Sequence, residues 1–199
     1  MAHDVLNRRA VLRALLGVGA TALLPMPVLA QPDIVAALQR GGHVVYFRHA
    51  ATTRSGVDRI EWPRSRQRLL SERGIADSEA IGAAFKALDI PVGDVLASPF
   101  ARCADMARIA FGRVETRMEL LGLLSDRAGR EARVAYLAGL FSAPPGPEGN
   151  RIVISHRSNI ATVAGVSLAE GDAAIIRPDG NGHTVLATLS PRDWVAIGG

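Results

Sequence analysis

Two histidines and two arginines follow apolar runs that each predict a β-strand. Arg48 and His49 end the first run, Arg102 comes shortly after the second, and His156 ends the third. Ligands bind at the carboxyl ends of the strands in an open α/β sheet, so these side chains meet if the three strands are parallel neighbours. Arginine binds oxyanions in a bidentate manner, and imidazole can act as a nucleophile or carry a proton. The spacing therefore predicts a phosphate pocket.

Three short motifs around these residues resemble those of the histidine phosphatase superfamily, which is also called the phosphoglycerate mutase-like superfamily. They are RHA at 48–50, SPFAR at 98–102 and SH at 155–156. The resemblance keeps the family's motif order and covers nearly all of the chain after its first 30 residues. It implies a three-layer α/β/α sandwich with a mostly parallel sheet. It also implies hydrolysis of a phosphate monoester without a metal or other cofactor.

The resemblance assigns a role to each of the four side chains. His49 is the nucleophile, and it forms a phosphohistidine that water then cleaves. This step needs His49 unprotonated on the attacking nitrogen, with the other nitrogen held by a hydrogen bond. Arg48 and Arg102 clamp the phosphoryl oxygens and neutralise the charge of the transition state. His156, in its protonated form, adds a third cation against the same oxygens.

The proton donor for the leaving oxygen has three candidates. Cleavage of a monoester needs an acid, and many relatives place a glutamate between the second arginine and the second histidine. Glu119 lies in that stretch and is our candidate, with Glu115 and Asp126 as alternatives. Some relatives carry an aspartate directly after the second histidine. Here that position is Arg157, whose side chain we expect to point away from the pocket.

Other residues near the motifs bear on the substrate. Ala51 stands where many relatives have glutamate, which argues against mutase-like phosphotransfer more than against hydrolysis. Thr52 keeps a hydroxyl beside it, and Asn159 follows the second histidine by three residues, as an asparagine often does in relatives. The resemblance implies that Asn159 orients the pocket, and we predict that both residues bind substrate. Arg68 could also reach the substrate, although arginine is most often at the surface. If the acid has been lost, the alternative is a non-catalytic domain that binds a phosphate ligand in the same pocket.

The first 30 residues have the order of an export signal. Arg8 and Arg9 precede a short apolar stretch at 14–24, and small residues follow at 28–30. This order is typical of a cleaved secretory signal, and the paired arginines indicate the twin-arginine type. The apolar stretch is shorter than the roughly 20 residues that a transmembrane helix needs. We therefore predict a signal at 1–30, a periplasmic location and no stable membrane insertion after the signal is removed. The alternatives are an uncleaved anchor or a helix packed on the domain.

Composition indicates one globular domain, which we place at 31–199. The chain has 199 residues, of which 48% are hydrophobic and 21% charged, unlike a disordered sequence. The formal net charge is +4, but no basic run alternates with aromatic residues, so we expect a small phosphorylated substrate and no nucleic acid. Cys103 is the only cysteine, which excludes an intrachain disulfide and a cysteine-based zinc site. His43 and His183 lack carboxylates at metal-site spacing, so we predict structural roles for them.

Hydrophobic patterns predict the elements that position these residues. A loop is expected over the strand ends at 52–66, where specificity loops commonly lie. The segment 67–87 is predicted as a helix interrupted near Gly74, and the Ser-Pro pair at 98–99 as the N-cap and first turn of the next helix. The remaining expected elements are helices at 33–40, 127–141 and 159–165, and strands at 43–49, 95–97, 114–118, 151–156, 173–177 and 184–189.

Overall fold

The fold is built on one six-stranded sheet, seen in a computed structural model that describes residues 31–125 and 128–199. The strand order is β3-β2-β4-β1-β5-β6. The predicted export signal lies outside the described residues. The strands are β1 (Val44–Arg48), β2 (Val92–Ala97), β3 (Glu115–Thr116), β4 (Asn150–Ser155), β5 (Ala173–Pro178) and β6 (His183–Leu189).

The three strands that lead into the motifs are parallel neighbours. β4 lies between β1 and β2 and pairs with both in parallel, and β3 continues the parallel arrangement beyond β2. β5 runs antiparallel to β1, and β6 runs antiparallel to β5. The prediction of a mostly parallel sheet is therefore confirmed.

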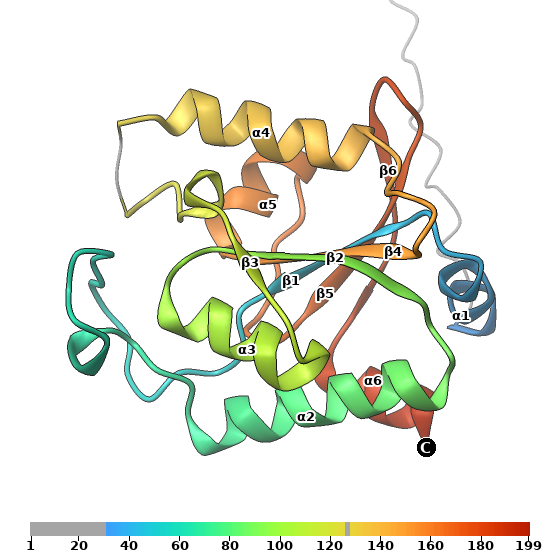
Figure 1. The fold of residues 1–199 in the computed structure, drawn as a ribbon, viewed down its shortest axis with the longest axis horizontal. Coiled ribbons are helices and arrows are strands. Elements are labelled where there is room, and N and C mark those ends of the chain that lie inside the picture. The colour runs from blue at the N-terminus through green and yellow to red at the C-terminus, as the bar shows by residue number, and fades with distance from the viewer. Residues whose placement is uncertain (1–30, 126–127) are drawn as a thin grey trace, which may run out of the picture.

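Helices form one layer on each face of this sheet (Figure 1). α4 and α5 cover one face, while α2, α3 and α6 cover the other. The predicted three-layer α/β/α sandwich is confirmed. The helices are α1 (Gln31–Gln39), α2 (Glu72–Ala87), α3 (Ala101–Phe111), α4 (Arg130–Ser142), α5 (Arg157–Ala164) and α6 (Pro191–Gly198), with 3-10 turns η1 (Arg64–Arg66) and η2 (Met118–Leu120).

Strand β1 is buried on both faces, because its side chains alternate between two cores. Val45 and Phe47 belong to the cluster that contains Trp194 of α6. Val44 and Tyr46 belong to the cluster on the α4–α5 face. A continuous apolar run of this kind is typical of a central parallel strand. It leaves the polar residues that follow as the first groups able to reach solvent at the sheet edge.

Helix α2 begins later than the sequence pattern predicts and is not interrupted. It starts at Glu72, and the side chain of Ser71 caps it by accepting a hydrogen bond from the Gly74 amide. A Cβ on Gly74 would collide with the carbonyl oxygen of Ala51. The glycine therefore serves a close backbone approach and not a helix break.

The start of α3 also differs from the prediction. The helix begins at Ala101 with Phe100 in the N-cap position and no side-chain cap. The prediction that Ser98 caps this helix is wrong, because its hydroxyl contacts a pocket histidine instead. Arg102 nevertheless lies in the first turn, as expected.

The C-terminal part of the chain holds an element that the patterns did not predict. Helix α6 opens with a capping box in which Ser190 and Asp193 each bind the other's backbone amide. Its Trp194 side chain is fully buried in the core. Within the described ranges, no helix is long and apolar enough to cross a membrane.

Candidate active site

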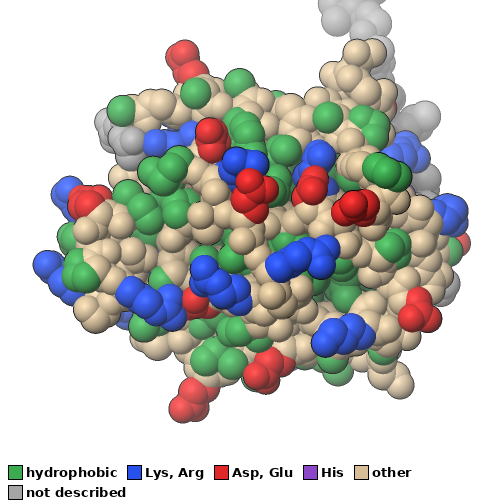
Figure 2. All heavy atoms as spheres, in the orientation of Figure 1, with side chains coloured by type: hydrophobic (Ala, Val, Ile, Leu, Met, Phe, Trp, Pro, Cys, Tyr) green, Lys and Arg blue, Asp and Glu red, His purple; other side chains and the backbone are tan. Residues whose placement is uncertain are grey.

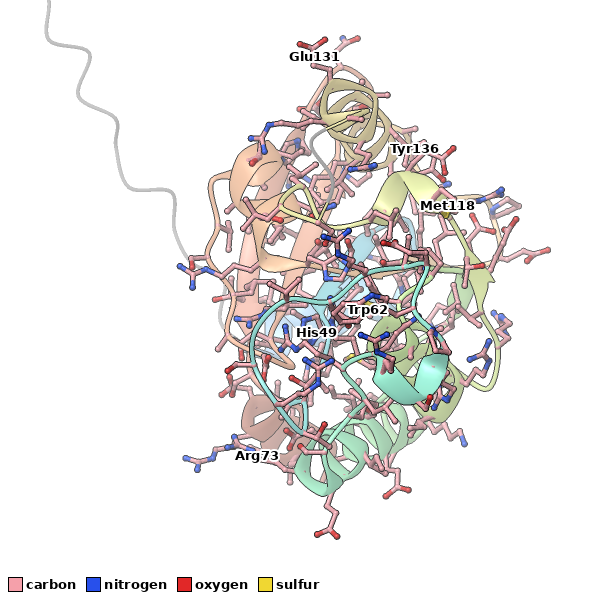
Figure 3. All side chains as sticks on the ribbon, turned by 90° about the vertical axis from the view of Figure 1, so that its left-hand side faces the viewer. His49, Trp62, Arg73, Met118, Glu131 and Tyr136 are labelled. Atoms are coloured by element: carbon pink, nitrogen blue, oxygen red, sulfur yellow. The ribbon has the colours of Figure 1, made fainter. Side chains whose placement is uncertain are left out.

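The register of the sheet brings the ends of the three motif strands side by side. Arg48 of β1 lies opposite Ser155 of β4, and Ala97 of β2 lies opposite Ile154. The His49 amide donates to the Ser155 carbonyl oxygen at 3.0 Å, which extends the pairing by one residue. The residues that follow each strand therefore meet at one edge of the sheet, where the loop after β1 passes in front of His49 (Figure 3).

A cavity of about 840 Å³ opens at this edge. Five arginines but one carboxylate, Asp58, lie among its lining residues. On the face in Figure 2, by contrast, positive and negative side chains are interspersed. The cavity is thus suited to an anionic ligand. Its lining residues are Arg48, His49, Gly56, Val57, Asp58, Arg59, Arg68, Arg102, Gly122, Leu124, Ser125, His156, Arg157, Ser158 and Ala161.

His49 is buried and held in one tautomer. Its Nδ1 lies 3.0 Å from the carbonyl oxygen of Ala50. A carbonyl can only accept, so Nδ1 carries the proton and Nε2 keeps its lone pair. Burial and then the charge of Arg102 lower the pKa of His49 to about 3, against a rise from the hydrogen bond with the Ala50 carbonyl. The imidazole is therefore neutral at physiological pH.

His156 presents the opposite tautomer. Its Nδ1 lies 3.3 Å from an NH2 nitrogen of Arg102, which can only donate, so Nδ1 accepts. Its Nε2 then donates to the Ser98 hydroxyl at 2.9 Å. Burial, followed by the charge of Arg102, lowers the pKa of His156 well below its ordinary value. The tautomer and the lowered pKa both favour a neutral ring, and the expectation that His156 adds a positive charge against the phosphoryl oxygens stays a prediction.

The two histidine rings lie close together, with centroids 5.6 Å apart. Each is fixed through its backbone as well as its ring. The hydroxyl of Tyr46, in β1, donates to the His156 carbonyl oxygen at 2.7 Å. Strands β1 and β4 are therefore braced to each other directly behind the pocket.

Arg102 forms a buried ion pair with Asp58, a residue that the sequence analysis did not select. The NH1 nitrogen of Arg102 lies 2.6 Å from Asp58 Oδ2, and the two side chains are 4% and 3% exposed. The amides of Arg68 and Arg59 also donate to this carboxylate, at 2.9 and 3.1 Å. Asp58 thus ties the loop after β1 to the first turn of α3. No local pattern signalled it, because it lies in a segment without periodicity.

Arg48 and Arg68 share a second carboxylate, Glu170. Their NH2 nitrogens lie 3.4 and 3.2 Å from Glu170 Oε1. Arg68 is also held by the Thr52 hydroxyl, at 2.6 Å. Arg68 is thus 15% exposed and faces the pocket, whereas Thr52 does not line it. The hydroxyl that we predicted to bind substrate instead positions an arginine.

Two arginine nitrogens in the pocket have hydrogen-bonding capacity to spare. The Nε atoms of Arg48 and Arg102 are buried and have no partner among the described residues. A buried donor without a partner costs about 1–3 kcal/mol. Both arginines line the cavity, so the guanidinium groups that carry these atoms adjoin the space for a ligand.

Comparison with protein-family models and with curated protein sequences gave no match. Solved structures do match. The protein histidine phosphatase SixA, complexed with tungstate, has a TM-score of 0.58 at 19% identity, covering 76% of this chain and 98% of that one. A putative alpha-ribazole-5'-P phosphatase from Escherichia coli K-12 has a TM-score of 0.56 at 16% identity, covering 75% and 98%. A mycobacterial glucosyl-3-phosphoglycerate phosphatase with inorganic phosphate has a TM-score of 0.53 at 14% identity, covering 76% and 99%. The chain has the phosphoglycerate mutase-like fold of these phosphatase structures.

Asn159 is not among the residues that line the cavity. Its side chain is 1% exposed, and its amide binds the Leu121 carbonyl and the Leu123 amide. The loop that it holds brings Gly122 against the ring of His156, where a Cβ would lie 3.2 Å from Cδ2. Asn159 therefore positions the pocket wall, in keeping with the orienting role that the resemblance implies, and a contact with substrate stays a prediction.

Glu119, our candidate acid, lies outside the cavity. It is exposed on η2, away from the lining residues. Burial raises the pKa of Tyr136, a residue of α4, and the charge of Glu119 adds to that rise. The carboxylate of Glu119 therefore lies on the side of η2 that faces α4. In Figure 3, Met118, the residue before Glu119, lies near Tyr136, and both lie well apart from His49. Neither Glu119 nor Glu115, which pairs with Arg117, lines the pocket.

Of the remaining residues considered in the sequence analysis, one lines the cavity and others lie outside it. Arg157, expected to point away, lines the pocket. His43 and His183 lie outside it: the former bonds the Gly41 carbonyl oxygen, and the latter packs edge-on against Phe141. The third candidate acid, at position 126, lies outside the described residues, so that prediction stands untested.

Proposed function

We propose that the protein is a phosphatase that hydrolyses a phosphate monoester through a phosphohistidine on His49. Support comes from the fold, from the five arginines of the cavity, and from the SixA and glucosyl-3-phosphoglycerate phosphatase structures, which hold tungstate and phosphate. The observation that carries the proposal is the tautomer of His49. Its Nδ1–H is fixed by the Ala50 carbonyl, so Nε2 is a neutral nucleophile.

In this mechanism, Nε2 of His49 attacks phosphorus while the bond to the ester oxygen breaks. Arg48, Arg68 and Arg102 bind the non-bridging oxygens, whose charge they neutralise. A water molecule then attacks phosphorus, the P–N bond breaks, and His49 and inorganic phosphate are released. His156 lies beside the nucleophile and positions Arg102 through Nδ1.

The leaving oxygen needs a proton, and no described carboxylate of the pocket is free to give one. Asp58 accepts three hydrogen bonds and pairs with Arg102. Glu170 lies between Arg48 and Arg68. Both carboxylates are thus engaged with arginines, and neither is placed to protonate the leaving oxygen. We therefore expect hydrolysis to depend strongly on the leaving group: aryl phosphates should react much faster than alkyl phosphates.

Trapping of the intermediate tests the proposal. Protein mixed with a ³²P-labelled aryl phosphate and quenched in alkali should carry an acid-labile, alkali-stable label, as a phosphoramidate does. His49→Gln should abolish both label and turnover. His43→Gln is the matched control, because that histidine lies outside the pocket, and it should retain both. Turnover by His49→Gln at the normal rate would refute the proposal.

Because Asp58 and Glu170 both pair with arginines and leave the pocket without an evident acid among the described residues, a second candidate is a non-catalytic domain that binds a phosphate ligand. That protein would bind inorganic phosphate in a calorimetric titration but release none from any ester. A phosphoglycerate mutase-like transfer is the less favoured alternative, because Ala51 replaces the glutamate of that motif. For location, we propose export to the periplasm on the twin-arginine pattern of the leader.

A further inference from the structure

Among the described residues, one arginine of the pocket has no counter-charge. Arg157 is the first residue of α5, is exposed, and lines the cavity together with Ser158 and Ala161 from the same helix. Among residues 31–125 and 128–199 it has no hydrogen-bond or ion-pair partner. Arg59, the other exposed arginine of the cavity, pairs with Glu61 at 3.4 Å. Arg157 thus differs from every other arginine of the lining.

The inner arginines already have partners and lie deeper. Arg102 pairs with Asp58 at 2.6 Å, and its side chain is 4% exposed. Arg48 and Arg68 share Glu170, with side chains 20% and 15% exposed. These three line the cavity together with the nucleophile, and each guanidinium carries several N–H donors. The inner pocket therefore has donors enough for one phosphoryl group without Arg157.

The outer cavity offers room and surface for the rest of a substrate. The whole cavity, inner pocket included, has a volume of about 840 Å³, in the upper part of the range of small-molecule sites and far above what one phosphoryl group fills. Two apolar side chains at its rim are exposed, Val57 by 71% and Leu124 by 85%. They come from two different loops. With Ala161 they give the cavity that Arg157 lines three apolar side chains.

We propose that the pocket takes monoesters whose leaving group carries a second oxyanion, a carboxylate or another phosphate, and that Arg157 binds this group. The inference rests on the proposed phosphatase function and names its substrate class. A guanidinium binds carboxylate and phosphate alike through paired N–H groups. The carbon framework between the two anions would lie against the apolar rim. Arg157 is thereby a specificity residue and takes no part in the transfer itself.

Matched aryl esters test the inference. Phenyl phosphate has a neutral leaving group, 3- and 4-carboxyphenyl phosphate add a carboxylate, and 1,4-phenylene bisphosphate adds a second phosphate. We expect the wild type to show a higher kcat/KM for at least one anionic ester than for phenyl phosphate. Arg157→Gln should lower that preference by about tenfold, the effect of losing a hydrogen bond between charged groups, through KM and not kcat. The two anionic arms distinguish a carboxylate from a phosphate.

Arg192→Gln is the control, because it removes an exposed arginine from α6 on the opposite helix layer. It should leave every value unchanged. An equal loss on phenyl phosphate in Arg157→Gln would mean that Arg157 holds the phosphoryl group, which overturns the inference. An unchanged preference, or a wild type that prefers the neutral ester, overturns it too. If no ester is hydrolysed, the phosphatase proposal fails by itself. Calorimetric Kd ratios for the same esters in both proteins then decide the role of Arg157.

Discussion

The neutral state of His49 should make the fold lose stability as the pH falls. The unfolded chain protonates this ring near its ordinary pKa of 6.5, whereas the folded pKa is about 3. A base whose pKa is depressed by folding binds fewer protons in the native state, so its stabilising effect is present above pH 6.5 and is lost as the pH falls toward 3. As the pH falls from about 7.5 to about 5, protonation of this ring in the unfolded chain should lower the free energy of unfolding by about 2 kcal/mol. That value depends on the unfolded pKa and hardly on the folded one.

Urea unfolding at the two pH values measures this loss. His49→Gln should lose about 2 kcal/mol less stability than the wild type over the same interval, because its side chain does not titrate. The other titrating groups are common to both proteins and cancel to first order. His156 has a shift of the same sign and adds to the loss in both. Equal pH dependence in the two proteins would refute the argument that His49 is buried and uncharged.

Three further predictions test the surroundings of the nucleophile and the leader. Asp58→Ala leaves the buried Arg102 without its partner, so it should destabilise the fold by about 3–5 kcal/mol in urea unfolding, whereas a loss under 1 kcal/mol would show that the pair is not buried in solution. Gly122→Ala places a methyl group against the ring of the second pocket histidine. It should lower kcat/KM by about tenfold with a small change in stability, and normal kinetics would show that the ring can yield. Replacing Arg8 and Arg9 by lysine should block export, and a normal periplasmic yield by immunoblot would rule out the twin-arginine pathway.

The sheet and the meeting of its three motifs could be predicted from the sequence for one physical reason. A central parallel strand is covered on both faces, so it appears as an unbroken apolar run, and the polar residue that ends the run must lie at the sheet edge. Arg48, His49 and His156 all follow such runs. The helix α6 could not be placed in the same way, because a short helix at the end of the chain gives little periodic signal.

The partners of the pocket arginines could not be predicted. Asp58 and Glu170 lie in loops, where neither hydrophobic period nor spacing fixes the direction of a side chain. Ser98 belongs to one of the three motifs, but serine is common at helix N-caps, so we predicted a capping role that the structure does not show. Glu119 was selected as the acid because of its position between the motifs. In the structure it lies on the 3-10 turn η2, on the side that faces α4, and does not line the cavity.

The two carboxylates that hold the inner arginines also affect how tightly a ligand can bind. A free arginine on a protein surface samples many rotamers, and an arriving anion must immobilise it at a cost of about 0.5–1.5 kcal/mol for each side chain. Here Asp58 and Glu170 have already restricted Arg48, Arg68 and Arg102. The three side chains therefore lose their rotamer freedom when the protein folds, and not when a ligand binds. The pocket can therefore accept a small, strongly hydrated oxyanion with little loss of side-chain freedom.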